Sequence, residues 1–321
     1  MKRSFIVFTT LFFALFATSC SSLKKEQLVN IGANDWIGYE PLFIASGQNY
    51  FKNPNIRVVE FGSTSETIKA YKNGLIEMAA VTLDEAILLK ETGYKPVIVL
   101  VFDISDGGDA IVAQKEIKDF QALKGKKIGF EKTALGAYVL ALALEKNKIK
   151  ESDIKMEYIE FSEHEDAFLN NLVDAVVTFE PTKSSLVKKG GNIVFDSKQI
   201  PNQIVDVLVV KEEFLKANPK AVEDVLSGWK IAYEKLKNSP DDIAKISSKK
   251  YKIDESEFLK LFEGIKIPSI SENRALLQNN NDSNLSKTAN MLMKIMKNKA
   301  LLKEEISLSG LIDDSFIKAI K

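Results

Sequence analysis

At residues 34–47 the chain reads Asn34-Asp35-Trp36-Ile37-Gly38-Tyr39-Glu40-Pro41-Leu42-Phe43-Ile44-Ala45-Ser46-Gly47, and this stretch decides the fold. An apolar segment over residues 28–31 leads into it and predicts a strand. Pro41 predicts the first turn of a helix, where the N–H that proline lacks is not needed. A loop between a strand and a helix lies at the carboxyl edge of a sheet, where open α/β sheets bind ligands. Trp36 and Tyr39 make this loop a candidate site, although loop aromatics also serve simply as packing.

The start of the chain has the features of an export signal. Met1-Lys2-Arg3 is basic, and the apolar run over residues 5–17 is short for a membrane span. The run ends in Ala17-Thr18-Ser19-Cys20, which resembles the lipobox of bacterial lipoproteins and holds the one cysteine of the chain. The resemblance implies a signal peptide over residues 1–19, a lipid on Cys20 and a tether over residues 20–27. The alternative is an ordinary signal peptide with an incidental cysteine.

The composition excludes some classes of partner. The chain has 321 residues, and 44 Lys and Arg balance 44 Asp and Glu, so no net field favours nucleic acid. After residue 17 no apolar stretch is long enough to cross a bilayer. Arginine, the usual clamp for carboxylate, sulfonate and phosphate groups, occurs only at Arg3, Arg57 and Arg274.

The order of apolar and polar segments predicts an α/β protein. Strand patterns that end in polar turns and lead into helical patterns recur from residue 28 to residue 113, and the same pattern restarts at residue 127. A further apolar segment over residues 205–210 precedes a helical tail with too few strands for a sheet of its own. We therefore expect two mainly parallel sheets flanked by helices, with the tail docked on the first sheet.

Several motifs resemble one family of transport proteins. Residues 36–42 resemble the opening signature of the substrate-binding proteins of nitrate, sulfonate, taurine and thiamine-precursor ABC importers. Residues 73–79, 123–129 and 174–181 resemble three further motifs of this family in the same order, with Glu77 at a position where the family has aspartate. The similarity covers roughly residues 29–237.

The resemblance implies a bilobed type II periplasmic-binding fold with a ligand cleft between the lobes. Lobe one would combine residues 28–112 with residues 205–321, and lobe two would span residues 113–204. The implied function is that of an extracytoplasmic lipoprotein that delivers a small molecule to the permease and ATPase subunits of an ABC importer. We expect a monomer without a cofactor, a metal or enzymatic activity.

The turns at the strand ends supply the candidate ligand-binding residues. They are Asp35, Trp36, Tyr39, Ser63, Thr64, Thr82, Asp84, Asp103, Asp109, Glu131, Thr133, Glu180 and Asp206. Aromatic rings suit a heterocycle or an organic cation, and the carboxylates could pair with ligand amines. Among these turns only Lys132 is basic. We therefore favour a neutral or cationic nitrogen compound, such as an aminopyrimidine or an amine.

Two other functions and one other ligand class stay open. Helix N-termini near residues 63–67 and 133–137 bind anions without arginine, so a sulfonate or nitrate is an alternative ligand. A sensor subunit that reports its ligand to a membrane signalling protein would have the same sequence features. Pyrimidine synthases with this fold use a histidine and a cysteine-rich segment, whereas this chain has one histidine, His164, expected to be exposed at a helix start.

Overall fold

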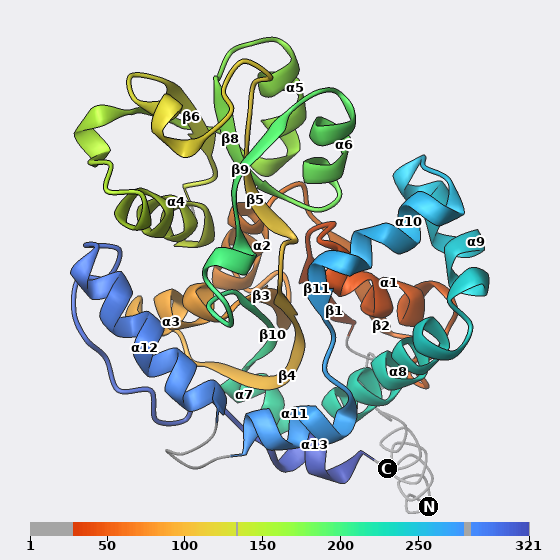
Figure 1. Cartoon of the computed structure of the whole chain (residues 1–321). Coiled ribbons are helices and arrows are strands. Elements are labelled where there is room, and N and C mark those ends of the chain that lie inside the picture. The colour runs from red at the N-terminus through yellow and green to blue at the C-terminus, as the bar shows by residue number, and fades with distance from the viewer. Residues whose placement is uncertain (1–27, 133, 279–283, 321) are drawn as a thin grey trace, which may run out of the picture.

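The computed structural model describes residues 28–132, 134–278 and 284–320. The predicted signal peptide, the tether with Cys20, and the candidate Thr133 lie outside the described residues. Figure 1 shows two α/β bodies, each built around one sheet, with α4, α5 and α6 in the upper body and the other labelled helices around the lower sheet.

The larger sheet has six strands in the order β11-β4-β10-β3-β1-β2. Its strands are β1 (Val29–Ala33), β2 (Ile56–Glu60), β3 (Met78–Thr82), β4 (Pro96–Ser105), β10 (Val205–Lys211) and β11 (Ile265–Lys266). All five residues of β3 are buried, because helices cover both faces at the centre of the sheet. In the edge strand β2, Arg57 and Glu60 are exposed, and such charges keep an edge from pairing with other chains.

The smaller sheet has five strands in the order β7-β6-β8-β5-β9. Its strands are β5 (Asp109–Ala113), β6 (Lys127–Phe130), β7 (Lys155–Tyr158), β8 (Ala175–Phe179) and β9 (Asn192–Asp196). Strand β5 therefore pairs within the second sheet, whereas the predicted division after residue 112 placed it with lobe one. The exact lobe boundary stays a prediction.

The sheets are mixed, whereas the sequence predicted mainly parallel ones. Strands joined by helical crossovers are parallel, as in β1 with β2 and β3, or β6 with β7 and β8. Strands that enter a sheet from the other body run the opposite way: β10 is antiparallel to β3 and β4, and β5 is antiparallel to β8 and β9. A helical crossover produces parallel pairs, and these strands arrive without one.

Thirteen helices pack on the described parts of the sheets. They are α1 (Glu40–Gly47), α2 (Thr64–Lys72), α3 (Leu83–Glu91), α4 (Ala134–Lys146), α5 (His164–Leu169), α6 (Thr182–Lys188), α7 (Glu212–Ala217), α8 (Pro219–Asn238), α9 (Pro240–Tyr251), α10 (Glu255–Leu261), α11 (Ile270–Leu277), α12 (Asn284–Asn298) and α13 (Ser315–Ala319). A short 3-10 turn, η1 (Ile37–Tyr39), precedes α1. Helices α7 to α13 wrap the larger sheet (Figure 1).

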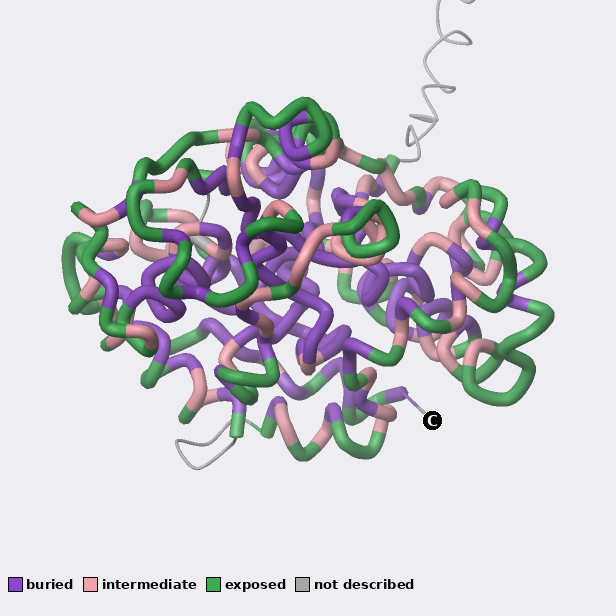
Figure 2. Tube along the Cα trace, turned by 45° about the horizontal axis from the view of Figure 1, so that its top comes forward, coloured by how far each residue is buried: buried purple, intermediate pink, exposed green. Residues whose placement is uncertain are grey.

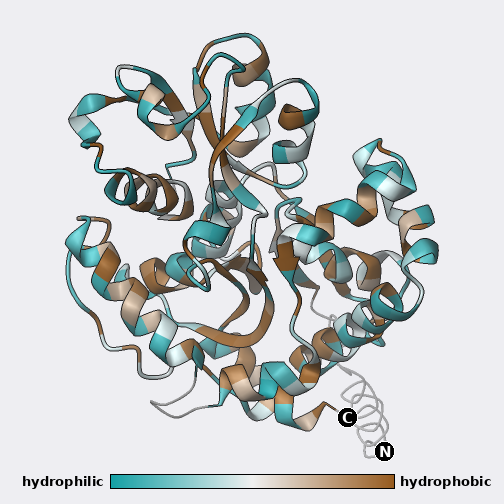
Figure 3. Cartoon of the chain, viewed as in Figure 1, coloured by the Kyte–Doolittle hydropathy of each residue, from teal (hydrophilic) through white to brown (hydrophobic). Residues whose placement is uncertain are grey.

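The buried apolar core follows the strands. Figure 2 shows buried residues through the middle of the molecule, and Figure 3 shows hydrophobic strands beneath helices with hydrophilic outer faces. Asn273 of α11 is fully buried, and its side chain bonds both the backbone N–H and the carbonyl of Val101 in β4. This pairing fixes the C-terminal helices to β4, whose far end leads directly to the space between the sheets.

Candidate functional site

Two adjoining cavities lie between the sheets. The first cavity is lined by Thr64, Glu85, Asp109, Glu131, Leu135, Gly136, Val139, His164, Val177, Thr178 and Phe179. The second cavity is lined by Asn34, Trp36, Tyr39, Thr64, Thr82, Asp109, Leu135, Phe179 and Asp206. They share Thr64, Asp109, Leu135 and Phe179, so the two cavities form one continuous site.

Trp36 and Tyr39 each donate a side-chain hydrogen bond to a buried carboxylate. Trp36 Nε1 donates a 3.0 Å hydrogen bond to Asp103 Oδ2, and the Tyr39 hydroxyl donates a 2.5 Å hydrogen bond to Asp206 Oδ1. Asp103 and Asp206 lie opposite each other in the antiparallel pair β4 and β10. Burial raises the pKa of both carboxyl groups well above the usual range, and their mutual proximity raises that of Asp206 further.

Gly38 lies directly against the first of these hydrogen bonds. A Cβ atom at this position would lie 1.8 Å from Asp103 Oδ2 and 2.5 Å from Trp36 Nε1. Only glycine therefore lets the η1 backbone pass this close to the Asp103 carboxylate. The sequence contained the signal, a glycine between two aromatic residues, but not the identity of its distant neighbour.

A second aromatic group reaches the site from the smaller sheet. The Trp36 ring meets Phe179 edge-on, with ring centroids 5.6 Å apart, and Phe179 stacks on Phe161 with centroids 3.9 Å apart. Neither phenylalanine was among the predicted site residues, because both lie in segments that read as ordinary strands. Trp36 is only 3% exposed, and it lines the second cavity.

The start of α3 adds acidic groups from the larger sheet. The backbone N–H of Thr82 donates a 2.9 Å hydrogen bond to Glu85 Oε2. The other oxygen, Oε1, is buried and has no hydrogen-bond partner among the described residues. Burial raises the pKa of Asp84 to about 6 and that of Glu85 well above its usual range, where the nearby Asp84 also contributes. Glu85 lines the first cavity, although the sequence analysis selected Asp84 instead.

The start of α2 is already occupied by groups of the protein. Ser63 Oγ accepts the backbone N–H of Glu66 at 3.2 Å, which makes Ser63 a helix cap. Glu131 Oε1, at the end of β6 in the smaller sheet, accepts the backbone N–H of Ser65 at 2.6 Å. Thr64 Oγ1 accepts a bond from the Asn34 side chain at 2.8 Å and lines both cavities.

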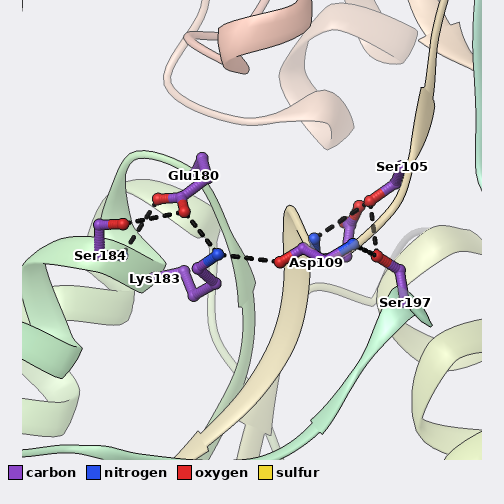
Figure 4. A network of polar contacts seen from close by, with 7 residues as sticks. Ser105, Asp109, Glu180, Lys183, Ser184 and Ser197 are labelled. Atoms are coloured by element: carbon purple, nitrogen blue, oxygen red, sulfur yellow. Dashed lines mark hydrogen bonds and ion pairs between the residues drawn. The ribbon is translucent and has the colours of Figure 1, made fainter. Parts of the chain in front are cut away.

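Asp109 lies where β5 leaves the turn between the two sheets, and it lines both cavities. Burial raises its pKa to about 7, although a hydrogen bond with Ser105 and the charge of Lys183 act in the opposite direction. Its backbone N–H donates a 3.2 Å hydrogen bond to Ser105 Oγ, which also contacts Ser197 Oγ at 2.8 Å (Figure 4).

Glu180 is bonded to groups near the turn between the sheets and does not line either cavity. Its carboxylate pairs with Lys183 Nζ at 2.6 Å and accepts bonds from the backbone and hydroxyl of Ser184. Lys183 Nζ in turn donates to the carbonyl of Gly107 at 2.8 Å, and Figure 4 shows this lysine between Glu180 and the turn. Asp35 also lies outside both cavities, and burial raises its pKa to about 6.

His164 is buried, whereas the sequence analysis expected it to be exposed. Its Nδ1 lies 3.3 Å from Thr178 Oγ1 and its Nε2 lies 3.2 Å from the Ile159 carbonyl oxygen. Burial lowers its pKa to about 4, so the imidazole is neutral at pH 7. The difference arises because α5 packs on β8, a contact that local sequence does not encode.

The structure therefore divides the predicted site residues into three groups. Those that line a cavity are Trp36, Tyr39, Thr64, Thr82, Asp109, Glu131 and Asp206. Asp84 and Asp103 are buried next to cavity-lining residues, and Asp35, Ser63 and Glu180 contact other parts of the protein. Among the described lining residues of both cavities there is no lysine and no arginine.

Within residues 28–132, 134–278 and 284–320, no set of three or more His, Cys, Asp or Glu side chains is arranged to hold a metal ion. No described helix has both the length and the apolar composition needed to cross a membrane.

Comparison with known proteins identifies a family. A sequence model described as the NMT1-like family matches residues 22–248. A protein of Brucella abortus (strain 2308), named as a binding protein, is 26% identical over 156 residues, which are 46% of this chain and 48% of that protein. The chain thus spans about half the length of the curated relatives it matches. The family match confirms the resemblance predicted from the motifs.

Two solved structures share the fold. The ligand-binding component of an ABC-type import system from Staphylococcus aureus, solved with zinc bound, has a TM-score of 0.76 at 15% identity and covers 92% of this chain and 99% of its own. The alkanesulfonate-binding protein SsuA from Xanthomonas axonopodis pv. citri, bound to MOPS, has a TM-score of 0.74 at 15% identity, over 89% and 98% of the two chains. These likenesses confirm the predicted bilobed periplasmic-binding fold.

Proposed function

The chain belongs to the NMT1-like family, and we propose that it is the solute-binding component of an ABC importer. It would capture a small molecule between its two sheets and deliver it to permease and ATPase subunits. The cavities between the sheets support this proposal, because their walls come from both bodies and would close around a ligand by a hinge motion.

We propose further that the ligand is a positively charged or neutral nitrogen compound. The observation that carries this proposal is the lining itself: Glu85, Asp109, Glu131 and Asp206 supply carboxyl groups, and the described lining holds no lysine or arginine. A bound cation would offset the cost of burying negative charge in these walls. Tyr39 and Trp36 add a hydroxyl and a ring face, which suit an amine or a heterocycle.

The alkanesulfonate ligand of a structural neighbour raises the anion as a second candidate. An anion without arginine would need free N–H groups at a helix N-terminus. At α2 the N–H groups of Ser65 and Glu66 already donate to Glu131 and Ser63. The protein's own carboxylate therefore fills the anion position at α2, which is one of the two helix N-termini where a sulfonate would bind.

Enzymatic activity is the less favoured alternative. His164 is buried and neutral, and its two ring nitrogens already face Thr178 and the Ile159 carbonyl. A sensor subunit would bind its ligand in the same way as a transport subunit. The two would be distinguished by the partner that the closed, ligand-bound protein contacts, which is a permease in one case and a signalling receptor in the other.

We also propose that the protein is anchored at the extracytoplasmic face of a membrane through a lipid on Cys20. The lipobox-like Ala17-Thr18-Ser19-Cys20 supports this proposal. Cys20→Ala should release the protein from the membrane fraction or leave its signal peptide uncleaved. Normal processing and anchoring of the variant would contradict the lipid anchor and leave the cavity unaffected.

A thermal-shift panel on residues 22–321 tests the ligand class. The panel would contain aminopyrimidines, thiamine, polyamines, taurine, alkanesulfonates, nitrate and bicarbonate. A ligand at about 100 times its Kd adds about 2.7 kcal/mol of stability, which raises Tm by several degrees. Stabilisation by nitrogen bases would support the proposal, whereas stabilisation by the anions alone would overturn it.

A further inference from the structure

We infer that the ligand carries two positively charged nitrogens joined by an apolar chain, with one nitrogen in each cavity, as in a linear diamine. The inference rests on the proposed function and narrows its ligand class. It is carried by the division of the site into two cavities, each with its own acidic groups, on either side of a junction that includes two apolar side chains.

The first cavity holds the anchor for one nitrogen. Glu85 reaches it from the larger sheet, and Glu131 reaches it from the smaller sheet. Both side chains are at least nine-tenths buried, with exposures of 1% and 5%. Glu85 Oε1 is without a hydrogen-bond partner among the described residues, although a buried carboxylate oxygen ordinarily has one. An ammonium group in this cavity would supply it.

The second cavity holds a separate anchor. Asp206 lines it and is 3% exposed, and the Tyr39 hydroxyl fixes Asp206 Oδ1 at 2.5 Å. The Trp36 ring forms part of the wall, and an aromatic face attracts a cation. Neither Glu85 nor Glu131 lines this cavity, so the two acidic anchors are distinct.

The junction between the cavities suits a methylene chain. Of the four residues common to both linings, Leu135 and Phe179 are apolar, and Thr64 and Asp109 are polar. A single ammonium has three N–H donors in one place. A ligand with one ammonium group could bind the acidic group of one cavity. The acidic group of the other cavity would then have no positively charged partner on the ligand.

Titration calorimetry of the purified protein with chain-matched amines tests the inference. Putrescine has two amino groups, and butylamine has the same carbon chain with one. We expect putrescine to bind about tenfold more tightly or better, the gain of one more charge-assisted hydrogen bond. Equal affinities would overturn the two-nitrogen inference and leave the proposed function standing. If taurine binds and neither amine binds, the proposed ligand class is overturned as well.

Two variants locate the anchors. Glu85→Gln keeps an acceptor for the Thr82 N–H but removes the charge of the first cavity, and Asp206→Asn does the same in the second. Each should reduce the preference for putrescine over butylamine to about threefold or less. The control is Glu77→Gln, because Glu77 also accepts a backbone N–H, from Asn30 at 2.7 Å, but lines neither cavity.

The affinities of a variant are interpreted only if thermal unfolding shows that the variant is folded. Since Glu85 and Asp206 lie on different elements, either variant alone is sufficient for the test. A putrescine preference that survives in both folded variants would overturn the assignment of the anchors. Loss of the putrescine preference in Glu77→Gln would also overturn the assignment of the anchors, because the effect would then not be specific to residues that line the cavities.

Discussion

Glu131 Oε1 accepts a 2.6 Å hydrogen bond from the backbone N–H of Ser65, and this bond joins the end of β6 in the smaller sheet to the first turn of α2 on the larger one. The first turn of a helix is where proteins most readily hold an anion. Here a side chain of the protein is that anion. The bond therefore both connects the two bodies and closes an anion site next to the first cavity.

Removal of Glu131 should open the α2 N-terminus to a ligand anion. We expect taurine to leave the Tm of the wild type unchanged and to raise that of Glu131→Ala, since an anion at a helix N-terminus contributes about 0.3–2 kcal/mol. The control is Glu145→Ala, whose carboxylate pairs with Lys299 on the surface. A taurine response of both variants, or of neither, would contradict this role of Glu131.

Tyr39→Phe should destabilise the protein because it removes the hydroxyl that donates to Asp206. A buried acceptor that loses its partner costs about 1–3 kcal/mol. Tyr71→Phe is the matched control, because the Tyr71 hydroxyl is buried without a hydrogen-bond partner among the described residues. Its removal should be neutral or stabilising. Urea unfolding measures both, and equal losses would show that the Tyr39 bond contributes nothing.

Gly38→Ala should lower both stability and ligand affinity. The new Cβ would lie 1.8 Å from Asp103 Oδ2, so the Trp36–Asp103 hydrogen bond must break or η1 must move. Gly47→Ala at the exposed end of α1 is the control, because no heavy atom lies within 4 Å of its Cβ position. That change should be neutral or stabilise by up to about 1 kcal/mol. Similar behaviour of the two variants would argue against the close approach at Gly38.

The ligand-free protein should lose stability as the pH rises towards neutral because of Asp109. Burial raises the pKa of its carboxyl from 3.8 to about 7, so between these values the folded state binds more protons than the unfolded state. The unfolding free energy then falls as pH rises, by up to about 1.4 kcal/mol per pH unit. His164, with its pKa lowered to about 4, gives the opposite slope below its ordinary value of 6.5.

Comparison with Asp109→Asn isolates the contribution of Asp109, because the His164 contribution is common to both proteins. The amide stays neutral, so the stability of the variant relative to the wild type should increase from about pH 4.5 to about pH 7. Urea unfolding at several pH values measures this difference. A difference that does not change with pH would mean that Asp109 is not protonated in the folded, ligand-free protein.

The sequence predicted the parts of the site that depend on strand ends. The cavity-lining residues Trp36, Tyr39, Thr64 and Thr82 lie at the ends of β1, β2 and β3 or just after them, and Asp109 and Asp206 lie at the starts of β5 and β10. Periodicity and turn residues locate such ends without any knowledge of distant contacts. The α/β class was predictable for the same reason, whereas the bilobed fold was implied by the resemblance of the motifs to one family.

The remaining features depend on contacts between segments far apart in the chain. Glu85 reaches the first cavity because α3 faces the smaller sheet, and Phe179 reaches Trp36 across the two bodies. Glu180 resembles a family motif, yet Lys183 and Ser184 engage its carboxylate. The direction of a strand that enters a sheet from the other body depends on the path of the chain in three dimensions. For this reason the antiparallel pairs, and so the mixed sheets, were not predicted.

The most direct test of the central claim is a crystal structure of the protein with the ligand that gives the largest thermal shift. The account predicts a ligand nitrogen within about 3.2 Å of the Glu85 or the Asp206 carboxylate, with Glu131 still bonded to the Ser65 N–H. A sulfonate or other anion seated on the first turn of α2, with Glu131 displaced, would contradict it.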